Sequence, residues 1–386
     1  MAKKGKKGKK LNIGVSLFIK KEGDSIFSNG IKQNVLMFCK LLKQSKKLNE
    51  VYIINVGDGE DPSLLMMDGV DIKVVRFDDV QDEIDVLIEL GAQTGHKITG
   101  KVRENGGKVV AYKGGNDWWI DTERTLFDLK PGAVFIGIEY DAIWTTPQHM
   151  NTNYHYFRLA YDTEVKEVPH IWDPFFIDKI IEQCKKPYEY QPGKKKWNIG
   201  VFEPNINMVK TCHYPMLLLE DTYRHYKRDL GLTEEEHRLG DIYITNSLKL
   251  KDREIFRHFS NTLDIVKDNK ASFEARYKLP WFISEYTDAV VSWQMENALN
   301  YMWYDVLYGN YPLIHNAHFI KDAGYYYEGF NVEQGKEKLI EAFETHDENL
   351  EKYKQQSKET IWEHSAINPK NVKFHEDLIF ELYEKK

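Results

Sequence analysis

The feature that most constrains this chain is a strand, helix, strand pattern at residues 288–316. Residues 288–293 are an apolar run of strand length, residues 296–308 carry apolar side chains at helical spacing, and residues 311–315 have the pattern of a second strand. Gly309 stands where a left-handed helix end is expected. A unit of about 30 residues in this order is a βαβ crossover, whose strands run parallel. The sequence therefore predicts a parallel sheet.

Polar residues gather where the helix of this unit begins. Glu296 and Asn297 lie at its start, and Asn300 and Asp305 lie further along it. Free N–H groups and the helix dipole favour an anion at a helix N-terminus, and open α/β sheets bind ligands at the carboxyl ends of their strands. The segment predicts a nucleotide site, although a glutamate in a first helical turn is also ordinary capping.

Composition limits the class of protein. With 386 residues, of which 42% are hydrophobic and 29% charged, the chain has room for two cores of ordinary domain size. No apolar run approaches the roughly 20 residues that span a bilayer, and the Lys-rich start lacks an apolar segment, so a cytoplasmic location is expected. Cys39, Cys184 and Cys212 are widely spaced and odd in number, which favours reduced thiols over a disulfide framework or a zinc site.

Basic charge is concentrated at the start of the chain. Residues 1–10 hold six of the 53 basic residues, and removing them from the net charge of −7 leaves −13 for the remainder. Such a Gly/Lys segment is predicted to be disordered, and two roles stay open: contact with a polyanion, or solubilisation of the chain. The acidic remainder argues against broad binding of duplex DNA.

The first half alternates strands with helical stretches, which predicts a sheet covered on both faces. Strands are expected at residues 11–18, 51–56, 71–77, 84–89, 107–112, 133–138 and 142–145, with a first helix at 31–44. The loop of Ser28, Asn29 and Gly30, followed by Gln33 and Asn34, places small residues and amides after the first strand. This loop is a candidate for binding acceptor or phosphate, but the GxGxxG fingerprint of dinucleotide binding is absent.

The pattern then restarts after a turn-rich, charged stretch at residues 188–196. Residues 197–202 repeat the Asn-Ile-Gly-Val that opens the first strand, which predicts a second, similar domain. Lys210 follows this strand, where a lysine can reach a diphosphate. Further strands are expected at 241–245 and 262–266, and amphipathic helices at 336–354 and 373–383.

Three residues of the first half are candidates for a general base. Glu89 ends a strand, Asp117 follows a Gly-Gly turn, and His149 lies in a loop that contains a proline. A plain turn and a structural histidine are the competing interpretations of Asp117 and His149. The acidic runs at 58–61 and 78–79 have the composition of solvated loops, and no metal ligand is predicted.

Two Rossmann-like domains in tandem, with a lysine after the first strand of the second and an acidic residue opening a late helix, resemble the GT-B glycosyltransferases. In many retaining members a Glu lies thirteen residues before the Gly of a Gly-x-Pro pair, and a second Glu follows eight residues after the first. Glu296 precedes Gly309 by thirteen residues, but Pro312 comes three residues after Gly309. The second acidic position holds Tyr304, with Asp305 next to it, so the sequence departs from the pattern there.

The chain is more closely similar to a poorly characterised family of bacterial and viral proteins, a domain of unknown function that itself resembles GT-B transferases. The matching segments are GIKQN at 30–34, PQHM at 147–150, VPHIW at 168–172, FEPNINMVK at 202–210 and ENALNYMWYDVLYGNYPLIHN at 296–316.

The resemblance implies an α/β fold of two Rossmann-like domains that face a cleft. It divides the chain into a basic tail at 1–10, an acceptor domain at 11–190, a nucleotide-sugar domain at 197–365, and a C-terminal helix at 366–386 that crosses back to the first domain. The implied activity is transfer of a sugar from a nucleotide sugar, a UDP-sugar first, to a hydroxyl of a glycan or of a hydroxymethylated base of viral DNA. That reaction would take place in the cytoplasm, or in the host cytoplasm if the protein is viral. It would require no cofactor and no metal.

The resemblance also assigns roles to residues. Donor binding is expected from Asn205, Lys210, Arg276, Glu296, Asn297, Asn300 and Asp305. An inverting reaction would need a base, for which Glu89, Asp117 and His149 are the candidates, and both inversion and retention stay open. The competing hypothesis is a non-catalytic protein that binds nucleotide or nucleic acid and carries a basic tail.

Overall fold

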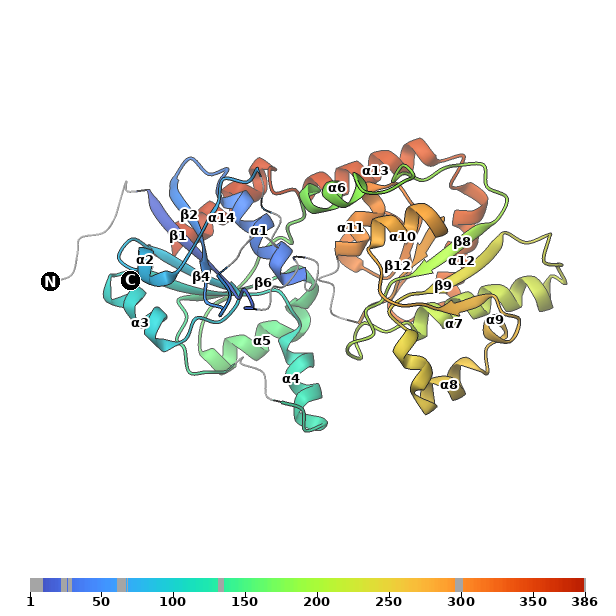
Figure 1. Cartoon of the computed structure of the whole chain (residues 1–386), viewed down its shortest axis with the longest axis horizontal. Coiled ribbons are helices and arrows are strands. Elements are labelled where there is room, and N and C mark those ends of the chain that lie inside the picture. Colours follow the sequence, from blue (N-terminus) through green and yellow to red (C-terminus); the bar gives the residue numbers. More distant parts are fainter. Residues whose placement is uncertain are drawn as a thin grey trace. The chain divides into compact units, whose positions relative to one another are not determined.

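The computed structural model describes residues 10–21, 26, 30–60, 67, 69–130, 135–295 and 301–384. The chain forms two compact units, one of Met1–Asp173 with Glu363–Lys386 and the other of Pro174–Trp362. Each unit is built on one parallel sheet with helices packed on it (Figure 1). The predicted fold class, two Rossmann-like domains, is confirmed.

The first unit has a seven-stranded sheet of order β3-β2-β1-β4-β5-β6-β7. Every neighbouring pair is parallel. The strand order reverses between β1 and β4, which is the place where doubly wound sheets bind ligands. The strands are β1 (Leu11–Leu17), β2 (Leu48–Asn55), β3 (Lys73–Val75), β4 (Val86–Gly91), β5 (Lys108–Lys113), β6 (Ala142–Thr145) and β7 (Val165–Glu167).

Helices of the first unit cover the sheet and bring the end of the chain back to its beginning. They are α1 (Gly30–Leu42), α2 (Phe77–Val80), α3 (His96–Glu104), α4 (Asp117–Leu126), η2 (Pro147–His149), α5 (Met150–Tyr161) and α14 (Pro369–Glu381). Phe38 of α1 packs edge-on against His375 of α14, with ring centroids 5.3 Å apart. The hydroxyl of Tyr383 donates to the backbone oxygen of Asp85 at 2.6 Å. The last helix therefore belongs to the first unit.

The second unit repeats this plan, with a six-stranded parallel sheet of order β10-β9-β8-β11-β12-β13. Its strands are β8 (Trp197–Val201), β9 (Leu239–Ile244), β10 (Ala271–Phe273), β11 (Ala289–Val291), β12 (Leu313–His315) and β13 (Tyr325–Tyr326). Its helices are α6 (Phe175–Ile181), α7 (His213–Arg224), η3 (His225–Asp229), η4 (Leu248–Asp252), α8 (Glu254–Ser260), α9 (Asp264–Lys267), α10 (Leu279–Tyr286), α11 (Tyr301–Tyr308), η5 (His318–Ile320), α12 (Val332–Thr345) and α13 (Leu350–Glu363).

The shared Asn-Ile-Gly-Val occupies equivalent strands, β1 and β8, at the centre of the two sheets. A Cβ on Gly14 would lie 2.9 Å from Cγ1 of Ile54, and one on Gly200 would lie 2.3 Å from the ring of Phe202. Close packing over the strand therefore excludes a side chain at both positions.

The chain passes between the units at Asp173 and Pro174, upstream of the turn-rich, charged stretch at 188–196 after which the sequence pattern restarts. Tyr188 and Tyr190 are buried. The hydroxyl of Tyr190 donates to Asp347 at 2.6 Å, so this stretch is packed into the second unit.

Four predicted elements are wrong. Residues 262–266 are not a strand: Asp264–Lys267 is helix α9, because the buried carboxylate of Glu220 accepts the backbone N–H groups of Asp264 and Ile265 at 2.8 and 2.9 Å. The sheet strand follows at β10. The described part of 133–138 contains no strand.

Helix ends account for the other two corrections. The predicted helix at 336–354 is two helices, α12 and α13, and His346 is fully buried between them. The left-handed residue after α11 is Asn310, with φ of 56°, rather than Gly309. Gly309 is small for another reason, since a Cβ there would lie 2.8 Å from the rings of Tyr188 and Tyr311. No helix in the described residues is long and apolar enough to cross a bilayer.

Candidate functional site

Polar and aromatic residues collect at the carboxyl edge of the second sheet, just beyond the strand ends. Glu203 follows β8, Asn246 follows β9, and Ser292 follows β11. Asn316 and Gly329 follow β12 and β13. Because the strands are parallel, their carboxyl ends meet at one edge, which is where ligands bind in open α/β sheets.

Glu203 fastens two of these strand ends together. Its side chain is fully buried, and its Oε1 accepts a hydrogen bond from Oγ of Ser292 at 2.5 Å and from the backbone N–H of Trp293 at 3.1 Å. Ser292 in turn accepts from Nε1 of Trp303 at 2.9 Å, and its backbone oxygen accepts from the hydroxyl of Tyr327, also at 2.9 Å. A buried carboxylate is thus held at the start of the loop that leaves β11.

Lys210 lies in the loop between β8 and α7 and interacts electrostatically with Glu203. Burial lowers the pKa of Lys210 to about 8, and the charge of Glu203 opposes this shift. Burial raises the pKa of Glu203 to about 7, against the hydrogen bonds from Ser292 and Trp293 and the charge of Lys210. Both groups titrate near neutral pH, and such perturbed groups cluster at functional sites.

Asn205 shapes the loop that carries Lys210. Its φ is 53°, a left-handed conformation that asparagine tolerates better than most residues. Its side-chain nitrogen donates to the backbone oxygen of Glu203 at 3.0 Å, and its Oδ1 accepts from the backbone N–H of Cys212 at 2.8 Å. The backbone N–H of Asn205 also donates to the backbone oxygen of Lys210, at 3.1 Å. The structure therefore places Asn205 beside the lysine, with its amide engaged in the loop.

An aromatic cluster of Tyr214, Trp293 and Phe330 stands at the same edge. The rings of Tyr214 and Trp293 are stacked with centroids 4.7 Å apart, and Phe330 packs within 4.9 Å of Tyr214 and 5.1 Å of Trp293. Trp293 is buried and donates its Nε1–H to Gly329 at 3.2 Å, whereas Phe330 is 50% exposed. The exposed ring of Phe330, packed on the stacked pair of Tyr214 and Trp293, suits the flat face of a nucleobase or a sugar.

Asn316 holds three loops of this edge in place. Its Oδ1 accepts the backbone N–H of Gln294 at 2.9 Å, and its Nδ2 donates to the backbone oxygens of Gln294 at 2.7 Å and of Gly329 at 3.0 Å. The loops after β11, β12 and β13 are therefore linked, which preorganises the aromatic cluster.

The remaining predicted donor residues are dispersed. Arg276 follows β10 and is exposed at the same edge. Asp305 lies in α11, where its backbone oxygen accepts from the hydroxyl of Tyr188 at 2.8 Å, toward the end of the helix. Tyr304, at the second acidic position of the motif, is fully buried in the core. Glu296, Asn297 and Asn300 lie outside the described residues.

The three candidate bases lie at the carboxyl ends of three neighbouring strands in the first unit, β4, β5 and β6. Glu89 is buried, its Oε1 accepts from Thr94 at 2.7 and 2.5 Å, and its Oε2 accepts from the hydroxyl of Tyr140 at 2.6 Å. These bonds tie the carboxylate into the loop after β4.

Asp117 and His149 differ in their surroundings. Asp117 opens α4, and burial raises its pKa to about 6, with a smaller opposing effect of Lys113. His149 is fully buried, with its Nδ1 3.1 Å from Oγ1 of Thr146. A carboxyl with a pKa of about 6, as Asp117 has, is suited to accepting a proton near neutral pH.

The predicted loop after β1 is described only in part. Gly30 begins α1, Gln33 donates to the backbone oxygen of Ile26 at 3.5 Å, and Asn34 is buried. Ser28 and Asn29 lie outside the described residues.

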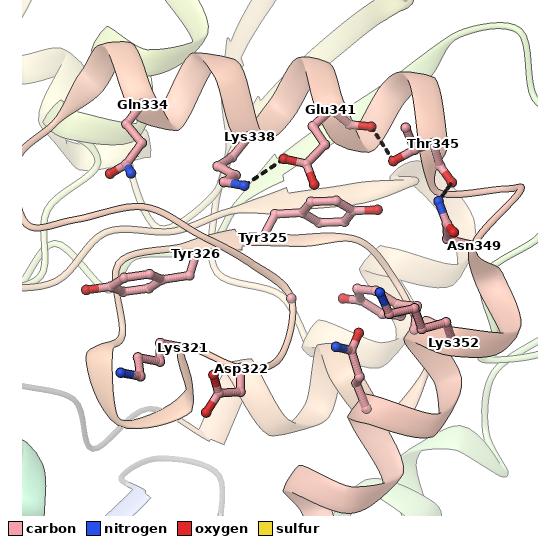
Figure 2. A pocket seen from close by; sticks show the side chains of 13 residues that line it. Lys321, Asp322, Tyr325, Tyr326, Gln334, Lys338, Glu341, Thr345, Asn349 and Lys352 are labelled. Carbon is pink, nitrogen blue, oxygen red and sulfur yellow. Dashed lines mark hydrogen bonds and ion pairs between the residues drawn. The ribbon is translucent and has the colours of Figure 1, made fainter.

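A separate hollow of about 580 Å³ lies beside β13, the outer strand of the second sheet, between α12 and α13 (Figure 2). Figure 2 shows Lys338 directed toward Glu341, with which it pairs at 2.7 Å. The residues that line the hollow include Lys321, Asp322, Tyr326, Gln334, Lys338, Glu341 and Lys352. Two buried groups of the second unit whose pKa is shifted toward neutrality, Glu203 and Lys210, lie at the carboxyl edge, which is therefore the stronger candidate. In the described part of the chain, no group of three or more His, Cys, Asp and Glu side chains is arranged to hold a metal ion.

Sequence reasoning missed Glu203, Ser292, Trp293, Tyr214 and Phe330 as site residues. Glu203 offered a signal, because an ionisable residue two positions after a buried strand stands where ligands bind. The aromatic residues offered none, because the loops that carry them are far apart in sequence.

Two Rossmann-like units in tandem define the GT-B class of fold. Within that class, the chain belongs to the family described as "Protein of unknown function (DUF2827)", whose sequence model matches residues 13–379. Both parts of the resemblance seen in the sequence are confirmed.

Solved structures of other proteins share this fold. A glycosyltransferase from Rickettsia africae has a TM-score of 0.58 at 11% identity, over 98% of this chain and 100% of its own. HepE from Anabaena, in complex with UDP and glucose, has a TM-score of 0.55 at 12% identity, over 95% of this chain and 98% of its own. The O-GlcNAc transferase of Thermobaculum terrenum has a TM-score of 0.56 at 10% identity, over 97% of this chain and 68% of its own. At these identities the likeness shows the fold alone, and no curated protein matches the chain.

Proposed function

We propose that the protein is a glycosyltransferase that takes a sugar from a nucleotide sugar, with a UDP-sugar as donor, and transfers it to an acceptor hydroxyl. The observation that carries this proposal is Lys210, a cation in the loop after the central strand β8, held next to the buried Glu203. Supporting it are the fold shared with glycosyltransferases and the UDP bound to HepE of Anabaena.

The proposed chemistry asks the second unit to stabilise a leaving group. The bond between the anomeric carbon and the diphosphate oxygen breaks, and the diphosphate keeps the electron pair. A bond forms to the acceptor oxygen, which loses its proton. Lys210, with Arg276 after β10 at the same sheet edge, supplies positive charge for the departing diphosphate, and such preorganised charge is commonly the largest catalytic contribution.

The aromatic cluster gives the donor a second point of attachment. We assign the flat face of the donor's base or sugar to Tyr214, Trp293 and Phe330, because these rings stand at the same sheet edge as Lys210. Stacking of a base on an aromatic ring contributes about 1–3 kcal/mol. The proton acceptor is assigned to the first unit, with Asp117 favoured by its raised pKa.

The test combines binding with product analysis. The folded protein is titrated calorimetrically with UDP and with other nucleotide sugars, and mass spectrometry follows products formed with two acceptor classes, glycans and DNA carrying hydroxymethylated bases. We expect UDP binding, its weakening in Tyr214→Ala, and transfer to one class. If no nucleotide sugar is bound or hydrolysed, the proposal fails. Binding of nucleic acid without any transfer would favour the non-catalytic alternative.

A further inference from the structure

Glu203 has no evident role in the proposed chemistry, yet it is one of the most completely buried acids of the second unit. It follows β8 by two residues, its side chain has no exposed surface, and it touches groups from two strand ends. Burying a carboxylate is costly unless its environment compensates. The position therefore calls for an explanation beyond packing.

We propose that Glu203 is a positioning residue of the donor site: its carboxylate joins the ends of β8 and β11 and keeps Lys210 positively charged toward a bound diphosphate. The inference rests on the proposed function only for the identity of the ligand, because the effect on Lys210 belongs to the protein itself.

The joining role follows from the hydrogen bonds. Oε1 of Glu203 holds both Oγ of Ser292 and the backbone N–H of Trp293, the first residues after β11. The backbone oxygen of Glu203 accepts from Asn205, which orders the loop of Lys210. A single residue thus links the cation to the tryptophan of the aromatic cluster, and it sets where a ligand's charged and flat parts meet the protein.

The charge role follows from what faces the carboxylate. The titratable groups that interact with Glu203 are Lys210 in the loop after β8, Cys212 at the start of α7 and Tyr327 after β13. Burial raises the pKa of Cys212 to about 12 and that of Tyr327 well above its ordinary value, so both stay neutral near pH 7. From β11 the contacts are uncharged, through Ser292 and Trp293. Lys210 is therefore the neighbour whose protonation responds to Glu203.

The sign of the effect is unexpected for an acid beside an anion site. Burial favours the neutral amine of Lys210, and the negative charge of Glu203 works against it. Without that charge, Lys210 loses its proton at a lower pH, so binding of an anion weakens above neutrality. At about pH 6 Lys210 is protonated, since its pKa is about 8. There the carboxyl of Glu203 is mostly neutral, since its pKa is about 7, so replacing it by a neutral residue changes little charge and an anion binds about equally well.

Glu203→Gln tests this directly, because glutamine keeps an oxygen that can accept from Ser292 and Trp293. The pH dependence of acetylation of Lys210 by acetic anhydride, read by peptide mass spectrometry on the full chain without ligand, reports its protonation. We expect the midpoint of Lys210 to move to lower pH in Glu203→Gln. An unchanged midpoint overturns the proposal.

Glu220→Gln is the matched control. Glu220 is also a buried acid of the second unit that accepts two backbone N–H groups, from Asp264 and Ile265, but it faces α9. Its substitution should leave the midpoint of Lys210 in place, and an equal shift in both variants would overturn the proposal. If Glu203→Gln does not fold, Ser292→Ala replaces it: losing the hydroxyl raises the carboxyl pKa, and an unshifted Lys210 midpoint again rejects the idea.

Binding of UDP supplies the second measurement. The ratio of UDP affinities, Glu203→Gln over wild type, should be near one at about pH 6 and lower by about tenfold at about pH 8.5, which corresponds to one pKa unit. A ratio that does not change with pH contradicts the proposal. If UDP binds wild type at neither pH, the proposed function fails, whereas the acetylation experiment still decides the link between Glu203 and Lys210.

Discussion

Lys210 is the residue on which the proposed reaction depends most. Lys210→Ala should lower kcat by about 100-fold or more with a smaller rise in KM, because a charge contact to the leaving group matters most in the transition state. Steady-state kinetics with the nucleotide sugar measure both constants. Lys358→Ala, at an exposed position of α13, is the control. An effect on KM alone would show that Lys210 contributes only to binding of the ground state.

Glu203 should make stability depend on pH. Its folded pKa of about 7 lies above the ordinary 4.5, so charging it in the folded protein is unfavourable. Its favourable contribution is therefore complete below pH 4.5 and is lost as the pH rises through 7. The folded pKa of Lys210 is lowered to about 8, so its buried charge destabilises the folded protein below that pH. This destabilisation decreases only as the pH rises above about 8.

Removing the charge of Glu203 should therefore stabilise the protein at neutral and higher pH. We expect Glu203→Gln to raise the free energy of unfolding at about pH 8 by on the order of 1–3 kcal/mol, and to change it little at about pH 4. Denaturant unfolding at the two pH values measures the difference. A gain of equal size at both would mean that packing, not charge, is responsible, whereas the expected result fits a site that gives up stability for function.

The sequence could indicate single residues only where position along the chain decides their role. The role of Lys210 could be predicted in this way, because a lysine after the first strand of a Rossmann-like domain lies at the carboxyl edge of the sheet, where ligands bind. Glu203 and Trp293 were not, since their pairing joins loops of two different strands and appears only once β8 and β11 are neighbours. For Tyr304 the motif spacing suggested a functional position, but the side chain is fully buried.

At the scale of elements, the repeated glycine of β1 and β8 carries a prediction. Gly200→Ala should destabilise the protein by about 1–3 kcal/mol, because the new Cβ would overlap the ring of Phe202 in a packed core. Gly100→Ala is the contrasting variant, since a Cβ there meets nothing within 4 Å. Helix propensity then favours alanine in α3 by about 1 kcal/mol. Chemical denaturation compares the two, and a similar loss in both would show that packing at Gly200 is not the cause.

Long or strongly patterned elements were predictable, and short ones governed by tertiary contacts were not. The strand β6 was predicted with its observed bounds, whereas β13, with two residues, carries too little pattern to detect. The β-branched run at 262–266 has strand propensity, but Glu220, more than forty residues earlier, caps it as a helix. Periodicity within a segment holds no information about such a partner.

At the scale of the whole molecule, the sequence order does not follow the units, because α14 belongs to the first of them. Ile379 of α14 is fully buried, so Ile379→Ala should destabilise the first unit by about 2–5 kcal/mol although it stands near the end of the chain. Leu339→Ala in α12 is the matched variant for the second unit, with an equally buried side chain.

Adding UDP distinguishes the unfolding transitions of the two units in these two variants. UDP at 100 times its dissociation constant should stabilise the unit that binds it by about 2.7 kcal/mol. Thermal unfolding of Ile379→Ala should therefore show one transition lowered and insensitive to UDP, and a second one raised by it. In Leu339→Ala the lowered transition should be the one that UDP restores. A single transition that responds to both substitutions and to UDP would show instead that the units unfold together, so that the donor site draws its stability from the entire chain.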